Sequence, residues 1–144
     1  MSIYKTVLAA IDLTEEADQV IKRAQELCKV HQAELILLHV VEPVGYAYGG
    51  DIPMDLTELQ EQLDKSAREQ LAGFGTDYSI PEKNLMVTVG RPEAEIHRVC
   101  EERAVDLAVV GSHGRHGIQL LLGSTANGVL HGAKCDVLAV RINT

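Results

Sequence analysis

The sequence contains no tryptophan and only one phenylalanine among its 144 residues. Apolar residues nevertheless make up 46% of the chain and charged residues 24%, a balance typical of globular proteins. The core must therefore be aliphatic. A chain of this length buries roughly two thirds of its unfolded surface on folding, so the core needs neither metals nor disulfides, and we expect one domain over residues 1–144.

Basic residues are also scarce, with 13 Lys and Arg against 21 Asp and Glu and a net charge of -8. Proteins that bind nucleic acid or anionic membranes need a basic surface, so we expect neither partner. The same charge means that local backbone dipoles would have to stabilise any bound phosphate.

Cysteines are few, and Cys28, Cys100 and Cys135 share no close spacing. Their pattern indicates a reducing compartment rather than a disulfide framework. No apolar run approaches the about 18 residues that a membrane span requires. The first residues lead directly into a strand pattern and do not resemble a signal peptide. We expect a soluble, cytoplasmic protein.

The chain does contain a regular alternation of strand and helix patterns. Continuous or alternating apolar runs predict strands at residues 4–12, 33–41, 84–89, 106–111 and 136–142. Apolar residues at steps of three and four predict helices at 14–28, at 56–75, from Pro92 and from 124 or 125. The last helix is expected to direct four side chains inward: Ala126, Val129, Leu130 and Ala133.

Alternating strands and helices predict a doubly wound α/β domain, with a parallel sheet and helices on both faces. The first, second and fourth runs are apolar throughout and suit interior positions, whereas Thr88 and Arg141 mark the third and fifth runs as edge strands. The five strands therefore take the order 3-2-1-4-5. Ligands bind such sheets at the switch point, here between strands one and four, where the loops begin at Asp12 and Gly111.

Residues 41–55 contain two prolines and three glycines and have no periodic pattern, so we expect a loop. Its length is unusual for a connection and is consistent with a lid or a partner contact. A mobile crossover without a specific role is an equally good interpretation.

The stretch from Asp106 to Thr125 has the pattern of an anion site. An apolar strand ends at Gly111, a loop follows with further glycines, and Gly123 leads into a capped helix start at Ser124. Glycines allow close backbone approach, and a helix N-terminus offers free N–H groups and a positive dipole end. Glycines that only form a tight turn are the alternative, and the coincidence with the switch point favours a phosphate site.

Two common nucleotide motifs are absent from the chain. No lysine precedes Ser124 in a P-loop frame, and the first strand-to-helix turn contains no glycine, which excludes the Rossmann fingerprint. Neither a P-loop lysine nor a water-activating residue is evident, so fast phosphoryl transfer is not indicated. We expect no enzyme, or at most a slow ATPase.

Asp12 follows the first strand at the predicted crevice. Its carboxylate could accept hydrogen bonds from ribose or adenine or help bind a metal ion on phosphates, or it could cap the following helix. At Val40 the backbone could meet an adenine edge, whereas its side chain is more simply part of the core.

Histidines and arginines near these loops give weaker signals. His113 and His116 lack further ligands at metal spacing, so a phosphate-facing imidazole or an ordinary loop histidine is the better interpretation. His39 lies inside an apolar strand and is expected to be a hydrogen-bonded core histidine. Arg91 and Arg115 could reach phosphates, although exposed arginines usually have no specific role.

Several of these segments together resemble the universal stress protein family over nearly the whole chain. They are Ile11-Asp12, Leu38 to Val40, Gly90 to Pro92, Val110 to Gly114 (VGSHG) and Leu122 to Thr125 (LGST). The resemblance implies a cytoplasmic, stress-induced homodimer that binds ATP or another adenine nucleotide such as ADP or AMP, with Mg2+ on the phosphates, and that signals to an unknown partner.

The resemblance also implies roles for individual residues. Ala10, Asp12 and Val40 would lie on the adenine and ribose side. Ribose and phosphates would contact Gly111, Gly114, Arg115, Gly123, Ser124 and Thr125. The family's dimer contact would fall on the last strand, at Val137, Leu138, Ala139, Val140, Arg141 and Ile142.

One departure from the family pattern concerns the phosphate loop. The ATP-binding members have G-x2-G-x9-G-[ST], whereas eight residues separate Gly114 from Gly123 here. The start of the chain resembles the UspA-type subclass, in which members that do not bind ATP are known. A nucleotide-free dimer that acts through protein contacts is therefore the competing hypothesis.

Overall fold

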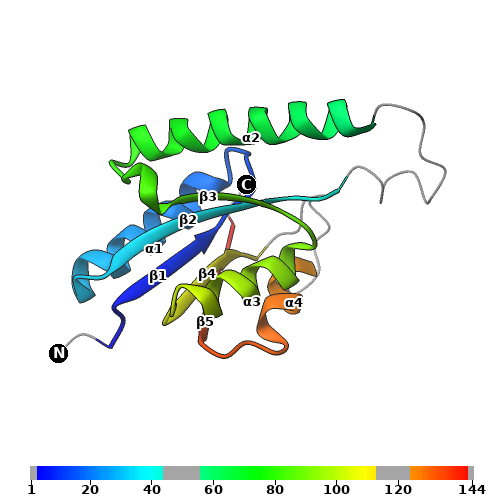
Figure 1. The fold of residues 1–144 in the computed structure, drawn as a ribbon. Helices are drawn as coiled ribbons and strands as arrows, with labels where there is room; N and C mark the ends of the chain where they lie inside the picture. Colours follow the sequence, from blue (N-terminus) through cyan, green and yellow to red (C-terminus); the bar gives the residue numbers. More distant parts are fainter. Residues whose placement is uncertain (1–2, 44–55, 113–123, 143–144) are drawn as a thin grey trace.

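The computed structural model describes residues 3–43, 56–112 and 124–142, which form a five-stranded parallel sheet and its helices (Figure 1). The strands follow the predicted order, β3-β2-β1-β4-β5. They are β1 (Thr6–Ala10), β2 (Glu34–Val41), β3 (Leu85–Val89), β4 (Leu107–Gly111) and β5 (Asp136–Val140). The helices are α1 (Ala17–His31), α2 (Leu56–Asp77), α3 (Pro92–Glu102) and α4 (Ser124–Leu130), with a short 3-10 helix, η2 (Glu82–Asn84).

The burial of the strands confirms which of them are central and which form the edges of the sheet. β1, β2 and β4 are almost entirely buried, whereas β3 and β5 are mostly half-buried and form the two edges. Continuous apolar runs belong to central strands because helices cover both of their faces. No helix among the described residues is long and apolar enough to cross a membrane.

The core divides into two clusters, one on each face of the sheet. Successive strand residues point to opposite faces, so Val7 and Ala9 pack with α1 and α2, and Leu8 packs with α3 and α4. Figure 1 shows α2 on one side of the sheet and α3 and α4 on the other. The prediction of helices on both faces is confirmed.

Three positions that the sequence predicts to face the core are exposed. Leu59 and Leu63 continue the buried stripe of α2 but are exposed, because the packing of this helix on the sheet begins only at Ala67. Leu130 was expected to point inward and is also exposed, since it is the last residue of α4 and Val129 already fills the inward position.

Element ends also differ from the predictions. The first helix begins at Ala17 rather than Thr14, and β5 ends at Val140 rather than Ile142. α2 continues past Gly75 to Asp77. A Cβ at Gly75 would lie 2.6 Å from Leu85 Cδ1, so this glycine permits helix-to-strand packing instead of ending the helix.

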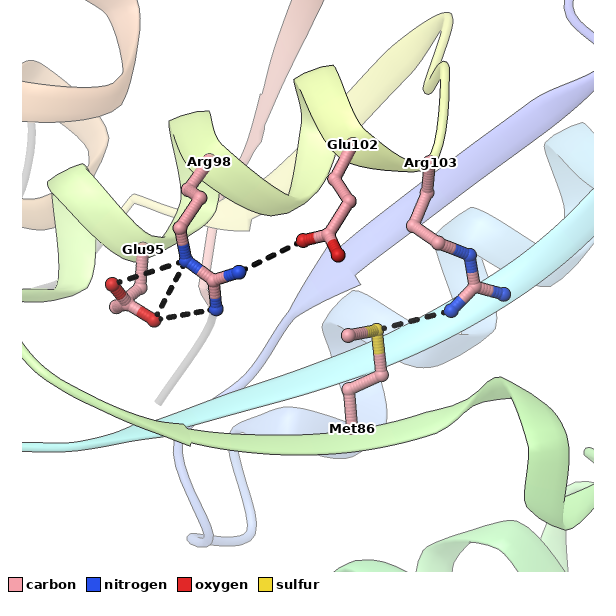
Figure 2. A network of polar contacts seen from close by, with 5 residues as sticks. All are labelled: Met86, Glu95, Arg98, Glu102 and Arg103. Carbon is pink, nitrogen blue, oxygen red and sulfur yellow. Dashed lines mark hydrogen bonds and ion pairs between the residues drawn. The ribbon is translucent and has the colours of Figure 1, made fainter.

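Polar contacts run along the outer face of α3, and one just past its end reaches β3 (Figure 2). Arg98 pairs with Glu95 and Glu102 at 2.8 Å each, and Arg103 Nη1 lies 3.3 Å from Met86 Sδ on β3. The Arg98 guanidinium holds the pKa of Glu95 below its ordinary value. Exposed pairs at this spacing add only about 0.3–0.5 kcal/mol each to helix stability.

Gly128 determines how closely α4 approaches α3. A Cβ at this position would lie 2.8 Å from Glu93 Cβ, an atom that cannot move without its backbone. Replacing Gly128 with alanine should lower the free energy of unfolding by about 1–3 kcal/mol, because the two helices must separate. Urea denaturation measures this change.

The matched control is Gly73→Ala on α2, where a Cβ would meet nothing within 4 Å. That change should stabilise the protein by about 0.5–1 kcal/mol, through helix propensity alone. Equal effects of the two substitutions would contradict the close packing of α3 on α4.

Candidate functional site

A crevice opens at the carboxyl ends of β1, β2 and β4, which is the predicted switch point. It contains about 770 Å3 of space, part of it open to solvent. The strand ends supply Ala10, Ile11, Asp12, Leu38, His39, Val40, Glu42, Val110 and Gly111. The helices and the C-terminal segment supply Glu16, Ala17, Val20, Pro92, Ile96 and Ile142.

Asp12 forms the turn that connects β1 to α1. Its Oδ1 accepts hydrogen bonds from the backbone N–H of Thr14 at 3.2 Å and from the Thr14 hydroxyl at 2.6 Å. Thr14 Oγ1 in turn accepts the N–H of Glu16 at 3.3 Å. Such an Asx turn satisfies N–H groups ahead of a helix. The contacts of Asp12 among the described residues use Oδ1 alone, so Oδ2 stays available at a residue that lines the crevice.

His39 is the buried, hydrogen-bonded histidine that the sequence predicts. Its Nδ1 lies 2.8 Å from the carbonyl oxygen of Ile11, and the side chain is buried. Since a carbonyl only accepts, Nδ1 carries the proton. Ile11 also donates its N–H to the Leu38 carbonyl at 2.9 Å. These two bonds join the ends of β1 and β2 and position Ala10 and Val40 in the same wall.

Gly111 lines the crevice at the end of β4, and Ser112 follows it. A Cβ at Gly111 would lie 3.4 Å from Ile142 Cδ1 and 3.5 Å from Val20 Cγ2, so this position faces side chains of the core. Ser112 donates its N–H to the Val140 carbonyl at 2.8 Å, and its Oγ accepts the Ile142 N–H at 3.1 Å. Ser112 thus attaches the C-terminal segment to the crevice.

The charges of the crevice are all of one sign among the described residues. Asp12, Glu16 and Glu42 line it, and no lysine or arginine does. Arg91, a candidate for phosphate contact, is exposed and pairs with Glu93 at 2.9 Å instead. The described ranges contain no group of three His, Cys, Asp or Glu side chains that could bind a metal ion.

The structure brings together Ala10, Asp12, Val40 and Gly111, four of the residues selected from the sequence. Ser124 and Thr125 are the first residues of α4. The remaining candidates lie outside the described residues: His113, Gly114, Arg115, His116, Gly123 and most of the loop at 41–55.

Sequence reasoning missed the contributions of Glu16, Glu42 and Pro92 to the crevice. Each of them lies shortly after the end of β1, β2 or β3 in the chain. Polar residues directly after parallel strands are the signal that could have identified the two glutamates.

Comparisons with known proteins agree on one family. The profile of the universal stress protein family matches residues 3–141. Universal stress protein A homologs 2 and 1 of Coxiella burnetii are 42% and 40% identical to this chain. The alignments cover 99% and 95% of this chain and 98% and 96% of those proteins.

Solved structures agree with this result. Protein MJ0577 of Methanocaldococcus jannaschii superposes with a TM-score of 0.82 at 25% identity, over 99% of both chains. Universal stress protein UspA from Lactobacillus plantarum gives 0.81 at 24% identity, over 98% of this chain and all of its own. At this identity, the likeness to the Lactobacillus plantarum protein concerns the fold alone.

Replacing Ser112 with alanine should lower the free energy of unfolding by about 1 kcal/mol, because the Ile142 N–H loses its acceptor. Urea denaturation checks this value. Ser66→Ala removes a hydroxyl that bonds only an exposed side chain, Gln70, and should change stability by less than about 0.5 kcal/mol. No difference between the two variants would contradict the role of Ser112.

Proposed function

The chain belongs to the universal stress protein family, and from this membership and the crevice we propose that it is a regulatory module that binds an adenine nucleotide. ATP, ADP and AMP are the candidates, and no catalytic step is part of the proposal. One observation carries it: the crevice at the switch point is lined by Ala10, Asp12, Val40 and Gly111. The sequence and its family resemblance indicate the same four residues.

The described crevice suits the base and the sugar. Its walls include apolar side chains of Val20, Leu38 and Ile96, which can contact the faces of a purine. Val40 lies at the end of β2, where backbone groups can meet the edge of the base. Oδ2 of Asp12 is available to accept hydrogen bonds from ribose hydroxyls.

Phosphates require a different part of the site. The three carboxylates of the described lining repel anions, so the phosphates would point away from them and toward the residues after Gly111. We assign this role to Gly114, Arg115 and Gly123, together with the start of α4 at Ser124 and Thr125. Mg2+ bound to the phosphates would reduce the remaining repulsion.

A solved universal stress protein in complex with cAMP also shares this fold, with a TM-score of 0.62 at 22% identity over 97% of this chain. A likeness at this level concerns the fold. cAMP is therefore a useful probe beside ATP, ADP and AMP, because it retains the base and has only one phosphate charge.

Asp12→Asn should weaken ATP binding about tenfold without changing the melting temperature. Asparagine keeps an acceptor for Thr14, but it replaces the charged acceptor that faces the ribose with a donor, and hydrogen bonds to charged groups contribute about 1.5–3 kcal/mol. Isothermal titration calorimetry measures the affinity. Asp12→Ala is the comparison, and it should lose both affinity and the stability of the turn.

Unchanged affinity in Asp12→Asn would place the ribose elsewhere. If the wild-type protein binds none of the four nucleotides at millimolar concentration, the competing hypothesis of a nucleotide-free dimer replaces this proposal. A binder should gain about 2.7 kcal/mol of stability at a nucleotide concentration 100 times its dissociation constant.

We also propose a homodimer that forms through β5, the last strand. Asp136 donates its N–H to the Asp106 carbonyl, and the Val140 carbonyl accepts from Ser112, so both residues pair with β4. Backbone groups alternate in direction along a strand. The backbone N–H and C=O groups of Val137, Ala139 and Arg141 therefore point away from β4, toward the unpaired edge of the sheet. The side chains of Val140 and Ile142, both named as interface candidates, are buried in the protomer's own core.

Ala139→Pro should produce monomers that remain folded. Proline removes an N–H that points away from β4, and such prolines are tolerated on edge strands. Light scattering measures the mass, and circular dichroism checks the fold. Ala139→Ser keeps the N–H and should stay dimeric. A proline variant with an unchanged dimer mass would contradict this interface.

A further inference from the structure

A second cavity lies on the α3 and α4 side of the sheet and is separate from the crevice. It contains about 640 Å3 of space and has His97, Cys100 and Cys135 in its wall. Apolar side chains such as Val105 and Val129 form much of the remainder. Nothing in the proposed nucleotide function uses this cavity.

Two of the three cysteines of the chain meet in this cavity. Cys100 lies near the end of α3 and is buried, and Cys135 directly precedes β5 and packs against the same core cluster. The two thiols are neighbours, because each of them affects the pKa of the other, and Ala108 on β4 lines the same cavity. Cys28 lies in the core cluster on the opposite face of the sheet.

We propose that this cavity is an oxidation site, at which a hydroperoxide converts Cys100 and Cys135 into an intramolecular disulfide. Cys135 is the nucleophile, because it is half-buried whereas Cys100 is buried, so a hydroperoxide reaches its sulfur first. Cys100 is the resolving thiol.

The reaction balances in two steps. The Cys135 thiolate attacks one oxygen of the hydroperoxide, the O–O bond breaks, and an alcohol (water, for hydrogen peroxide) leaves with a proton from solvent. Cys100 then loses its proton and attacks the sulfur of the resulting sulfenic acid, which releases water. Two thiols lose two electrons and two protons, and the hydroperoxide is reduced.

The reaction is slow at neutral pH. Burial, with a smaller contribution from Cys135, raises the pKa of Cys100 to about 12, and burial also raises the pKa of Cys135. The thiolate is therefore a minor species, and the rate should increase about tenfold per pH unit between pH 7 and pH 9. The pair stays reduced unless hydroperoxide persists.

The bond would join α3 to the segment that enters β5. Cys135 is adjacent to Asp136, the first residue of that strand, and Glu101 beside Cys100 already pairs with Lys134 at 3.3 Å. Oxidation would therefore add a covalent link between two elements that the exposed Lys134–Glu101 ion pair also connects.

The test exposes the reduced, full-length protein to hydrogen peroxide at pH 7 and pH 9 and then analyses it by mass spectrometry. We expect a mass loss of about 2 Da, a peptide that links Cys100 to Cys135, and a reduced Cys28. Dithiothreitol should reverse the change. Oxidation to sulfinic acid without a link, a link through Cys28, or a rate that does not depend on pH would overturn the proposal.

Three variants separate the roles of the cysteines. Cys28→Ser should form the disulfide at the wild-type rate. Cys135→Ser should leave Cys100 reduced, whereas Cys100→Ala should accumulate a sulfenic acid at Cys135 that dimedone traps. If Cys100→Ala does not fold, Cys135→Ser alone still tests the proposal. Oxidation of Cys100 in that variant at the wild-type rate would show that Cys135 is not the nucleophile.

Discussion

The parallel pairing of β1 with both β2 and β4 is the constraint on which the sites of this chain depend. Pairing aligns Ala10 with Leu38 and Ala9 with Val109, so the three strands reach the same edge of the sheet at the level of Ala10, and β2 continues from there to Val41. Beyond that level the chain must leave the sheet in different directions, which opens the crevice. The bonds of Ile11 to Leu38 and His39 and those of Ser112 to Val140 and Ile142 then fix its walls.

Electrostatics divides the crevice into two functional parts. The described lining contains Asp12, Glu16 and Glu42 without a cation, in a chain of net charge -8. Hydroxyl donors suit such a lining, and a triphosphate does not. In the proposed mode, an adenine nucleotide therefore has its sugar near Asp12 and its phosphates beyond Gly111. The proposal then expects the shortened spacing between Gly114 and Gly123 to change the phosphate contacts rather than those of the base and sugar.

The sequence predicts the strand order because burial on two faces produces continuous apolar runs, as in Leu35 to Leu38, whereas edge strands contain polar residues such as Thr88. It also identifies Asp12 and Val40, because strand ends at a switch point share one location. It does not predict that Leu59 and Leu63 are exposed, since periodicity shows a stripe and not what covers it. That Cys100 and Cys135 line one cavity depends on how α3 packs against the sheet, which no local pattern contains.

The central claim, that the crevice at the switch point binds the base and ribose of an adenine nucleotide, is tested most directly by a titration with ATP followed by backbone amide NMR. The account predicts saturable chemical-shift changes at Ile11, Asp12, Val40 and Gly111, and none near Cys100. Saturation without changes at these four amides, or with the largest changes at the second cavity, would contradict it.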